Sequence, residues 1–245
     1  MPEKLEIDSG TFLTDIERHF RVMAGPGAGK TYWLVNHIKQ VVARSKRLSP
    51  ASRIACISYT NVAVHEIVTQ LGSAATKVDA STIHSFLYRN VVRPYLHLLR
   101  DGDQPLVAFT SVDGHDEHHP SYTIVDEWLR SIGQAKILQR TFKEQRDILN
   151  DKLGQLVWQR SVDGVWTLGP RKLDRMGKIL NAICTSSNLI DYKRRYWRRG
   201  IVDHEDILYF AHRILEEHPL VCQCLSARYR YLFIDEFQDT LPIQT

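Results

Sequence analysis

The stretch AGPGAGKT, residues 24–31, decides the fold of this chain of 245 residues. Its three glycines and one proline break the chain between a short apolar segment, residues 19–24, and a stretch whose apolar residues recur at helical spacing. A glycine-rich loop between a strand and a helix points several backbone N–H groups into one concavity, beside the positive end of the helix dipole. The stretch therefore predicts a phosphate-binding loop that consists of Gly25, Pro26, Gly27, Ala28, Gly29, Lys30 and Thr31.

The last two residues of the loop have the chemistry that a nucleoside triphosphate requires. Lys30 would reach the β- and γ-phosphates, and the hydroxyl of Thr31 would hold Mg²⁺. Ala24 replaces the glycine of the stricter pattern, and alanine fits there if its φ is negative. A chance glycine-rich turn is the alternative, and the strand and helix expected on either side argue against it.

The segments around the loop alternate between strands and helices. We expect strands over residues 19–24, 53–59 and 77–80, the first two of them followed by amphipathic helices. This alternation indicates an α/β fold in which helices cover a parallel sheet. A further apolar run, residues 231–234, is typical of a buried strand.

Two carboxylates follow this last strand. Asp235 would lie at the carboxyl end of the strand, where open parallel sheets bind their ligands. We expect Asp235 to coordinate Mg²⁺ and Glu236 to polarise the attacking water. An ordinary polar turn is the alternative, and the phosphate-binding loop upstream weighs against it.

The region between the two halves of this site is predicted to be mostly helical. We expect a helix over residues 85–100 that kinks at Pro94, and a second over residues 141–153 that opens with a capping box. A third helix is expected over residues 170–184, and residues 156–168 are predicted to form a hairpin.

Positive charge is concentrated in this region. Residues 136–200 contain 15 Lys and Arg against 6 Asp and Glu, whereas the rest of the chain contains 17 against 22. The run YKRRYWRR, residues 192–199, could neutralise phosphates and stack on bases. A solvated helix end before Gly200 is the alternative. The candidate nucleic-acid contacts in this run are Arg194, Arg195, Trp197 and Arg198.

Composition excludes several other classes of protein. No stretch approaches the roughly 18 consecutive apolar residues of a membrane span, so we expect a cytoplasmic protein without a membrane partner. Four scattered cysteines are too few for a disulfide framework, which indicates reduced thiols in or near the core.

Four motifs, in order along the chain, resemble those of the UvrD/Rep family of superfamily 1 DNA helicases. AGPGAGKT resembles motif I, SYTNVA (58–63) resembles motif Ia, STIHSF (81–86) resembles the motif that follows it, and DEFQDT (235–240) resembles motif II. The matches span residues 22 to 244. The resemblance implies a RecA-like P-loop sheet with an inserted, mostly helical accessory domain, and a chain truncated after the Walker B strand.

The resemblance also implies the division of the chain. Residues 1–86 would form the first part of motor domain 1A, residues 87–200 the accessory domain 1B, and residues 201–245 the incomplete second part of 1A. Motif III and the second motor domain would then lie beyond the chain, so we expect this polypeptide alone to be weakly active or inactive.

Further site residues follow from the resemblance alone. Thr60, Asn61 and His84 would lie near the path of single-stranded DNA, and Gln238 would sit between the γ-phosphate and the DNA side. A helix cap at Asn61 and a satisfied core histidine at His84 are the structural alternatives. The family's adenine-reading glutamine is absent from residues 14–18, so the choice of base is open and ATP is the default.

The implied function is the ATP-binding part of a UvrD-like ATP-dependent DNA helicase or translocase, with ATP and Mg²⁺ as cofactors. Its partners would be single-stranded DNA, along which movement is expected to be three-prime to five-prime, and either a C-terminal helicase half or a partner subunit. The alternative is a non-catalytic helicase-like subunit that binds nucleotide or DNA in a bacterial repair or defence complex.

Overall fold

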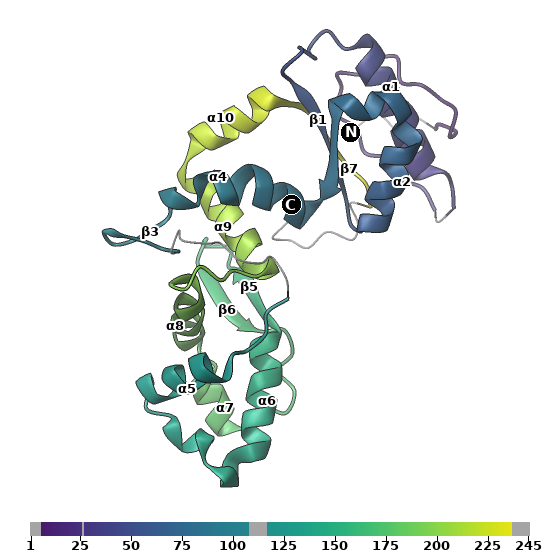
Figure 1. Ribbon diagram of the computed structural model, residues 1–245. Helices are drawn as coiled ribbons and strands as arrows, with labels where there is room; N and C mark the ends of the chain where they lie inside the picture. Colours follow the sequence, from purple (N-terminus) through teal and green to yellow (C-terminus); the bar gives the residue numbers. More distant parts are fainter. Residues whose placement is uncertain (1–5, 26, 108–116, 237–245) are drawn as a thin grey trace. The chain divides into compact units, whose positions relative to one another are not determined.

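The computed structural model describes residues 6–25, 27–107 and 117–236. These residues form two compact units (Figure 1). The sheet unit contains residues 6–86 and 222–236, and the helical unit contains residues 87–221. The helical unit therefore continues to residue 221, beyond the expected boundary at residue 200.

Three parallel strands build the sheet unit, in the order β2-β1-β7. They are β1 (Arg53–Ser58), β2 (Val78–Thr82) and β7 (Tyr229–Ile234). Ser58 pairs with Thr82 and Ile57 pairs with Ile234, so the carboxyl ends of all three strands lie at one edge. The predicted α/β fold with a parallel sheet is confirmed.

Two amphipathic helices, α1 (Lys30–Arg44) and α2 (Asn61–Leu71), belong to the same unit, with a 3₁₀ turn, η1 (Gly72–Lys77), after the second. Thr60 caps α2, because its side chain accepts a hydrogen bond from the Ala63 N–H. Each fully buried aliphatic side chain contributes about 2 kcal/mol through burial. The core consists of Leu34, Val35, Ile38, Val41, Ile54, Cys56, Ile67, Leu71, Val78 and Phe233.

The predicted strand over residues 19–24 is wrong, because these residues are mostly exposed and pair with no described strand. A strand requires a neighbour for its backbone hydrogen bonds, and among the described residues β7 pairs only with β1. Side-chain packing holds the segment instead. The Phe20 ring lies 5.4 Å from the Trp33 ring and 4.9 Å from the His37 ring.

The chain passes from the sheet unit into the helical unit through an irregular helix rather than a simple kinked one. It consists of α3 (Ile83–Leu87), a π-helical turn η2 (Tyr88–Val92), α4 (Arg93–Tyr95) and a 3₁₀ turn η3 (Leu96–Leu98). Pro94 has no N–H to donate, and the wide turn before it lets the Arg93 N–H bond the Tyr88 carbonyl.

The rest of the helical unit alternates short helices with two hairpins. The hairpin β5 (Leu156–Arg160) to β6 (Trp166–Pro170) confirms the predicted one, with Gly164 at φ 81° in the turn. The remaining elements are β3 (Arg100–Asp101), β4 (Gln104–Pro105), α5 (Tyr122–Ser131), η4 (Ala135–Leu138), η5 (Arg140–Phe142), α6 (Lys143–Gly154), α7 (Lys178–Ile183), α8 (Ser186–Trp197) and α9 (His204–Glu217). The last helix, α10 (Pro219–Arg228), begins in the helical unit and continues into the sheet unit from residue 222.

Two helix starts were predicted wrongly. The capping box at Thr141 does not form, because residues 140–142 make a 3₁₀ turn and α6 begins at Lys143 behind Phe142, whose side chain cannot cap. The helix expected from residue 170 begins only at Lys178, because Pro170 pairs with Leu156 in the hairpin. Within the described ranges, no helix is both long and apolar enough to cross a membrane.

Candidate functional site

The phosphate-binding loop leads directly into the N-terminus of α1. Gly27 and Gly29 have φ values of 72° and 77°, which a residue with a side chain adopts only under strain. The Gly29 carbonyl accepts the first bond of α1, from the Trp33 N–H at 2.9 Å. Pro26 lies outside the described residues. The described part of the loop therefore has the backbone that an anion-binding turn requires.

Lys30 points back across this loop. Its Nζ donates to the Ala24 carbonyl at 3.2 Å and lies 3.9 Å from Oε2 of Glu236. Both side chains of this ion pair remain partly exposed, at 24% for Lys30 and 34% for Glu236. The contacts are long or made to a neutral carbonyl, so a phosphate could replace them at little cost.

Asp235 and Thr31 meet at the carboxyl edge of the sheet. The Asp235 N–H donates to the Ile57 carbonyl at 2.8 Å, which extends the β7 ladder by one residue and holds the buried carboxyl in place. Burial, followed by the charge of Glu236, raises the pKa of Asp235, while Lys30 and a hydrogen bond with Thr31 oppose the rise. A cation beside Asp235 would stabilise the ionised carboxylate and counteract this rise in its pKa.

The oxygens gathered here fit Mg²⁺. A threonine hydroxyl and one or two carboxylates are hard ligands of the kind that this ion takes together with phosphate and water. Glu236 has a φ of 54°, a left-handed conformation that is uncommon for a residue with a side chain and is often found at functional sites. The structure thus brings Lys30, Thr31, Asp235 and Glu236 together from two distant segments. Gln238 lies outside the described residues.

The residues expected near DNA follow the other two strands at the same edge. Thr60 and Asn61 follow β1 and are exposed, while His84 follows β2 and is half-buried. The cap of α2 is Thr60 rather than Asn61, so the structural alternative for Asn61 is not realised. Tyr59, 59% exposed beside them, is an apolar ring at the surface that sequence reasoning did not single out.

The basic run lies on α8, and its tryptophan was predicted wrongly as a nucleic-acid contact. Trp197 is 1% exposed and packs against the rings of Trp158, Tyr209 and Phe210. It cannot stack on a base. The reason is helical geometry, because a residue at this position of α8 faces the core with Leu189 and Tyr196.

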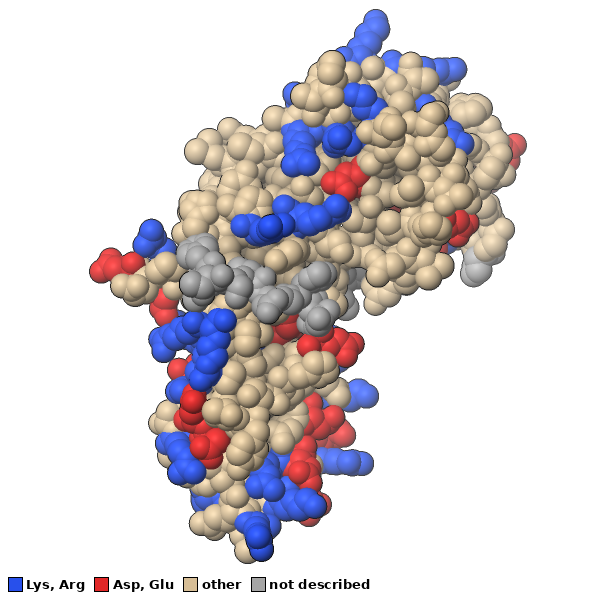
Figure 2. All heavy atoms as spheres, in the orientation of Figure 1, with Lys and Arg blue, Asp and Glu red and all other residues tan. Residues whose placement is uncertain are grey.

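The arginines of the run are largely neutralised. Arg194 pairs with Asp101 at 3.3 Å, and Arg195 pairs with Asp191 at 3.2 Å. Arg199 pairs with Glu127 at 2.9 Å. Figure 2 shows acidic side chains among the basic ones on the helical unit. Arg198 is exposed and makes no ion pair with a described residue, so it is the freest cation of the four predicted contacts.

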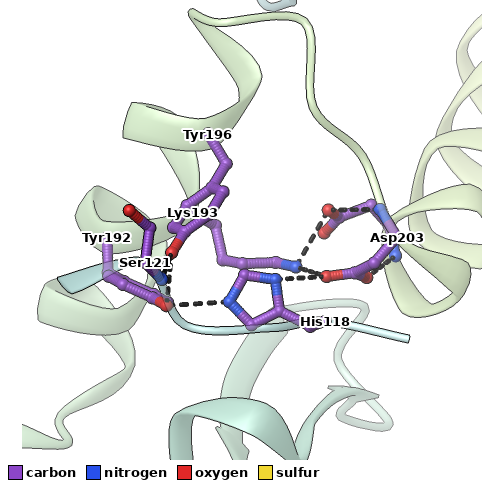
Figure 3. A network of polar contacts seen from close by, with 7 residues as sticks. His118, Ser121, Tyr192, Lys193, Tyr196 and Asp203 are labelled. Carbon is purple, nitrogen blue, oxygen red and sulfur yellow. Dashed lines mark hydrogen bonds and ion pairs between the residues drawn. The ribbon is translucent and has the colours of Figure 1, made fainter. Parts of the chain in front are cut away.

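Sequence reasoning missed the role of Lys193, which lies in the same run and is fully buried. Figure 3 shows its polar contacts. Its Nζ forms ion pairs with Asp203 and, at 2.9 Å, with Asp206. His118 donates from Nδ1 to Asp203 at 3.0 Å, and its Nε2 lies 2.8 Å from the Tyr192 hydroxyl. We call Lys193, Asp203, Asp206 and His118 the buried charge cluster.

Burial and pairing act against each other in this cluster. Burial, followed by the Asp203 carboxylate, raises the pKa of Asp206 to about 6. Burial works to raise the pKa of Asp203 as well, but Lys193 and His118 outweigh it and hold that pKa below the ordinary range. Burial also lowers the pKa of His118. The signal in the sequence was the spacing of Lys193 from Leu189 and Trp197 on the apolar face of α8.

Comparison with known proteins identifies relatives over nearly the whole chain. Gabija protein GajB of Bacillus cereus (strain HuB5-5) is 25% identical, over 89% of this chain and 35% of its own length. A probable DNA helicase II homolog of Mycoplasma capricolum subsp. capricolum is 23% identical, over 95% of this chain and 30% of its own. The ATP-dependent DNA helicase PcrA of Staphylococcus aureus (strain Mu50) is 24% identical, over 91% and 28%.

The chain spans about a third of the length of these relatives. The model of the UvrD/REP helicase N-terminal domain matches residues 8–245, which include every residue of the site described above. The resemblance inferred from the four motifs is therefore confirmed, and the chain belongs to the UvrD/Rep helicase family, whose N-terminal domain it represents.

Proposed function

We propose that the chain is the ATP-binding part of a UvrD-like DNA helicase or translocase, in which ATP hydrolysis drives movement along single-stranded DNA. The observation that carries the proposal is the convergence of Lys30 and Thr31 with Asp235 and Glu236 at one edge of the sheet. Phosphate-loop and carboxylate residues must meet in this way to bind one nucleotide and its metal.

Each residue then has a defined task. The backbone amides of the loop and the N-terminus of α1 bind the phosphates, and Lys30 stabilises the charge that develops on the γ-phosphate. Thr31 and Asp235 would hold Mg²⁺, and the ion would supply neutralisation of phosphate charge. Glu236 is released from Lys30 once a phosphate takes its place, and it can then accept a proton from the attacking water.

Single-stranded DNA is expected along the same edge of the sheet. Thr60 and Asn61 follow β1, which lies between β2 and β7 in the sheet, and His84 follows β2. A nucleotide that shifts the carboxyl end of β7 would therefore shift the DNA-facing residues after β1 and β2 at the same edge of the sheet. From the family resemblance we propose that Gln238 couples hydrolysis to movement and that movement is three-prime to five-prime. From the basic run we propose that Arg194, Arg195 and Arg198 contact DNA phosphates.

A second candidate is a helicase-like subunit that binds nucleotide or DNA within a larger complex. It is favoured by one observation, the similarity of the chain to a protein named as a Gabija component rather than as a helicase. In this case the nucleotide would hold the subunit in one conformation instead of driving movement.

Nucleotide binding tests the site that both candidates share. Titration with a fluorescent ATP analogue and Mg²⁺ should show that Lys30→Ala weakens binding at least tenfold, because the ammonium contributes a charge-assisted contact to the phosphates. Lys39→Ala is the matched control, since Lys39 lies on the exposed side of the same helix. Equal affinities for Lys30→Ala and the parent chain would exclude the proposed site.

Hydrolysis separates the two candidates. A form of the protein extended to the length of its relatives should hydrolyse ATP faster with single-stranded DNA, and Glu236→Gln should abolish that increase if the protein is a helicase. Nucleotide binding without any DNA-stimulated hydrolysis in the extended form would favour the subunit.

A further inference from the structure

Cations gather at the edge of the sheet opposite the nucleotide site. The strands are parallel, so the amino ends of β1 and β7 share this edge, and the chain from the end of α1 returns across it. Figure 2 shows blue Lys and Arg atoms grouped on the sheet unit with little red between them. We call this surface the basal patch; its exposed members are Arg44, Lys46, Arg47, Arg53, Arg228 and Arg230.

Contacts within the unit hold these residues near one another. An open hollow of about 490 Å³ is lined by Arg47, Ser226, Tyr229 and Arg230. The Ser45 hydroxyl lies 2.5 Å from the Tyr231 hydroxyl, which brings the segment after α1 against β7. The hollow therefore has a guanidinium from each of two segments and an aromatic ring in its lining.

The positive charge of the patch is mostly not neutralised. Arg47 pairs with Glu17 at 3.0 Å. Arg53 donates to the Thr76 carbonyl and Arg230 to the Ser226 carbonyl, and a neutral carbonyl leaves the charge of the arginine in place. Within the described ranges, the carboxylates form no ion pair with the other cations, which are Arg44, Lys46 and Arg228.

Helix ends explain only part of this arrangement. Arg44 and Arg228 lie in the last turns of α1 and α10, where cations are favoured by the helix dipole. Lys46, Arg47, Arg53 and Arg230 lie on connections or strands, so the dipole does not account for them. Like charges grouped on one surface, two of them lining its hollow, raise the local potential and attract a polyanion.

We propose that the basal patch binds the phosphodiester backbone of duplex DNA. Duplex DNA carries one charge per roughly 1.7 Å, the highest density that the proposed DNA motor would encounter, and it binds clustered Lys and Arg without regard to sequence. The choice of DNA rests on the proposed function, whereas the patch itself lies away from Lys30 and Asp235. The expected role is to hold duplex against the sheet unit while single strand passes the opposite edge.

The test is binding of a fluorescently labelled blunt 20-base-pair duplex over a series of NaCl concentrations. Removing three cations with Lys46→Ser, Arg228→Ser and Arg230→Ser together should lower the slope of log affinity against log salt by about 2 to 3, if each contacts one phosphate. We expect at least a tenfold loss of affinity at about 0.1 M salt. The control variant removes three exposed lysines of the helical unit, Lys136, Lys172 and Lys178, and changes the net charge equally.

Each outcome decides the matter. A loss in the patch variant that the control does not share supports the proposal, with thermal unfolding used to verify that both variants fold. An unchanged slope and affinity, an equal loss in the control, or no duplex binding by the parent chain would overturn it. Mg-ATP binding should be unchanged in the patch variant, so failure of the nucleotide site and failure of this surface give different results.

Discussion

The two units use a lysine and two carboxylates in opposite ways. At the proposed nucleotide edge, Lys30 Nζ lies 3.9 Å from Glu236 Oε2, and both side chains are partly exposed. In the buried charge cluster, Lys193 Nζ lies 2.9 Å from Asp206, and both side chains are 1% exposed. The first pair can be opened by water or a ligand, whereas the second has no access to either.

The difference shows how packing decides what a charge does. A charge that is loosely paired at an open edge is available to an incoming phosphate or metal ion. A charge that is buried must be fully paired, because removing it from water costs several kcal/mol. The same residue types therefore form the proposed binding site in the sheet unit and a structural joint between α8, α9 and the segment at His118 in the helical unit.

The largest expected effect comes from breaking the structural joint. Lys193→Met leaves Asp203 and Asp206 buried without their cation, so we expect the free energy of unfolding to fall by about 3–5 kcal/mol. Urea denaturation followed by circular dichroism would measure it. Lys172→Met, at an exposed position, should change the stability by less than about 0.5 kcal/mol.

A compensating variant makes this prediction sharper. Adding Asp203→Asn and Asp206→Asn to Lys193→Met removes all three charges of the ion pairs that Lys193 forms with these aspartates. Asparagine at residue 203 can still cap α9. Most of the lost stability should return. If Lys193→Met were as stable as the parent chain, the cluster would not hold the helical unit together.

A smaller effect is expected from the proton that the cluster can bind. The pKa of Asp206 is about 6, against about 3.9 for an unfolded aspartate, so the contribution of this residue to stability increases as the pH falls through that window. His118 acts in the other direction, because burial lowers its pKa and stability is lost once the unfolded imidazole is protonated below about pH 6.5.

Asp206→Asn removes only the first of these contributions. Acidification from pH 7 to pH 5 should therefore destabilise the variant more than the parent, by on the order of 1 kcal/mol. Urea midpoints measured across this range test it, with Asp163→Asn in the exposed hairpin turn as the control. Parallel pH profiles for Asp206→Asn and the parent would contradict the assigned direction.

The smallest effect on stability is expected at the nucleotide edge. Burial and Glu236 raise the pKa of Asp235, so its ionised form destabilises the fold at neutral pH, and Asp235→Asn should leave stability equal or higher, within about 1 kcal/mol. The same change should abolish the rise in melting temperature that Mg-ATP produces, because a metal ligand is lost. The control variant Asp103→Asn, at an exposed site, should retain that rise. An Asp235→Asn variant that is less stable than the parent and still gains melting temperature with Mg-ATP would contradict both expectations.

Local pattern was sufficient for much of the sheet unit. The glycines of the loop, the helical spacing of α1 and the apolar run of β7 are each a pattern within one short segment, so elementary conformational preferences predict them. The strand over residues 19–24 failed for the opposite reason, because a strand depends on a neighbour that local sequence does not specify. The prediction of a helix from residue 170 was wrong for a similar reason, since Pro170 lies in β6 and pairs with Leu156 of β5.

The sequence by itself determined the family, the glycine-rich loop and the identity of the groups that we propose to hold nucleotide and metal, because those depend on side-chain chemistry and short-range spacing. Only the tertiary structure decided which charges of the basic run are available. Lys193 and Trp197 read as candidate surface groups next to Arg198, yet packing against α9 and β5 buries both. Burial is a property of long-range contacts, and it converts one cation into a structural joint while leaving another exposed to solvent.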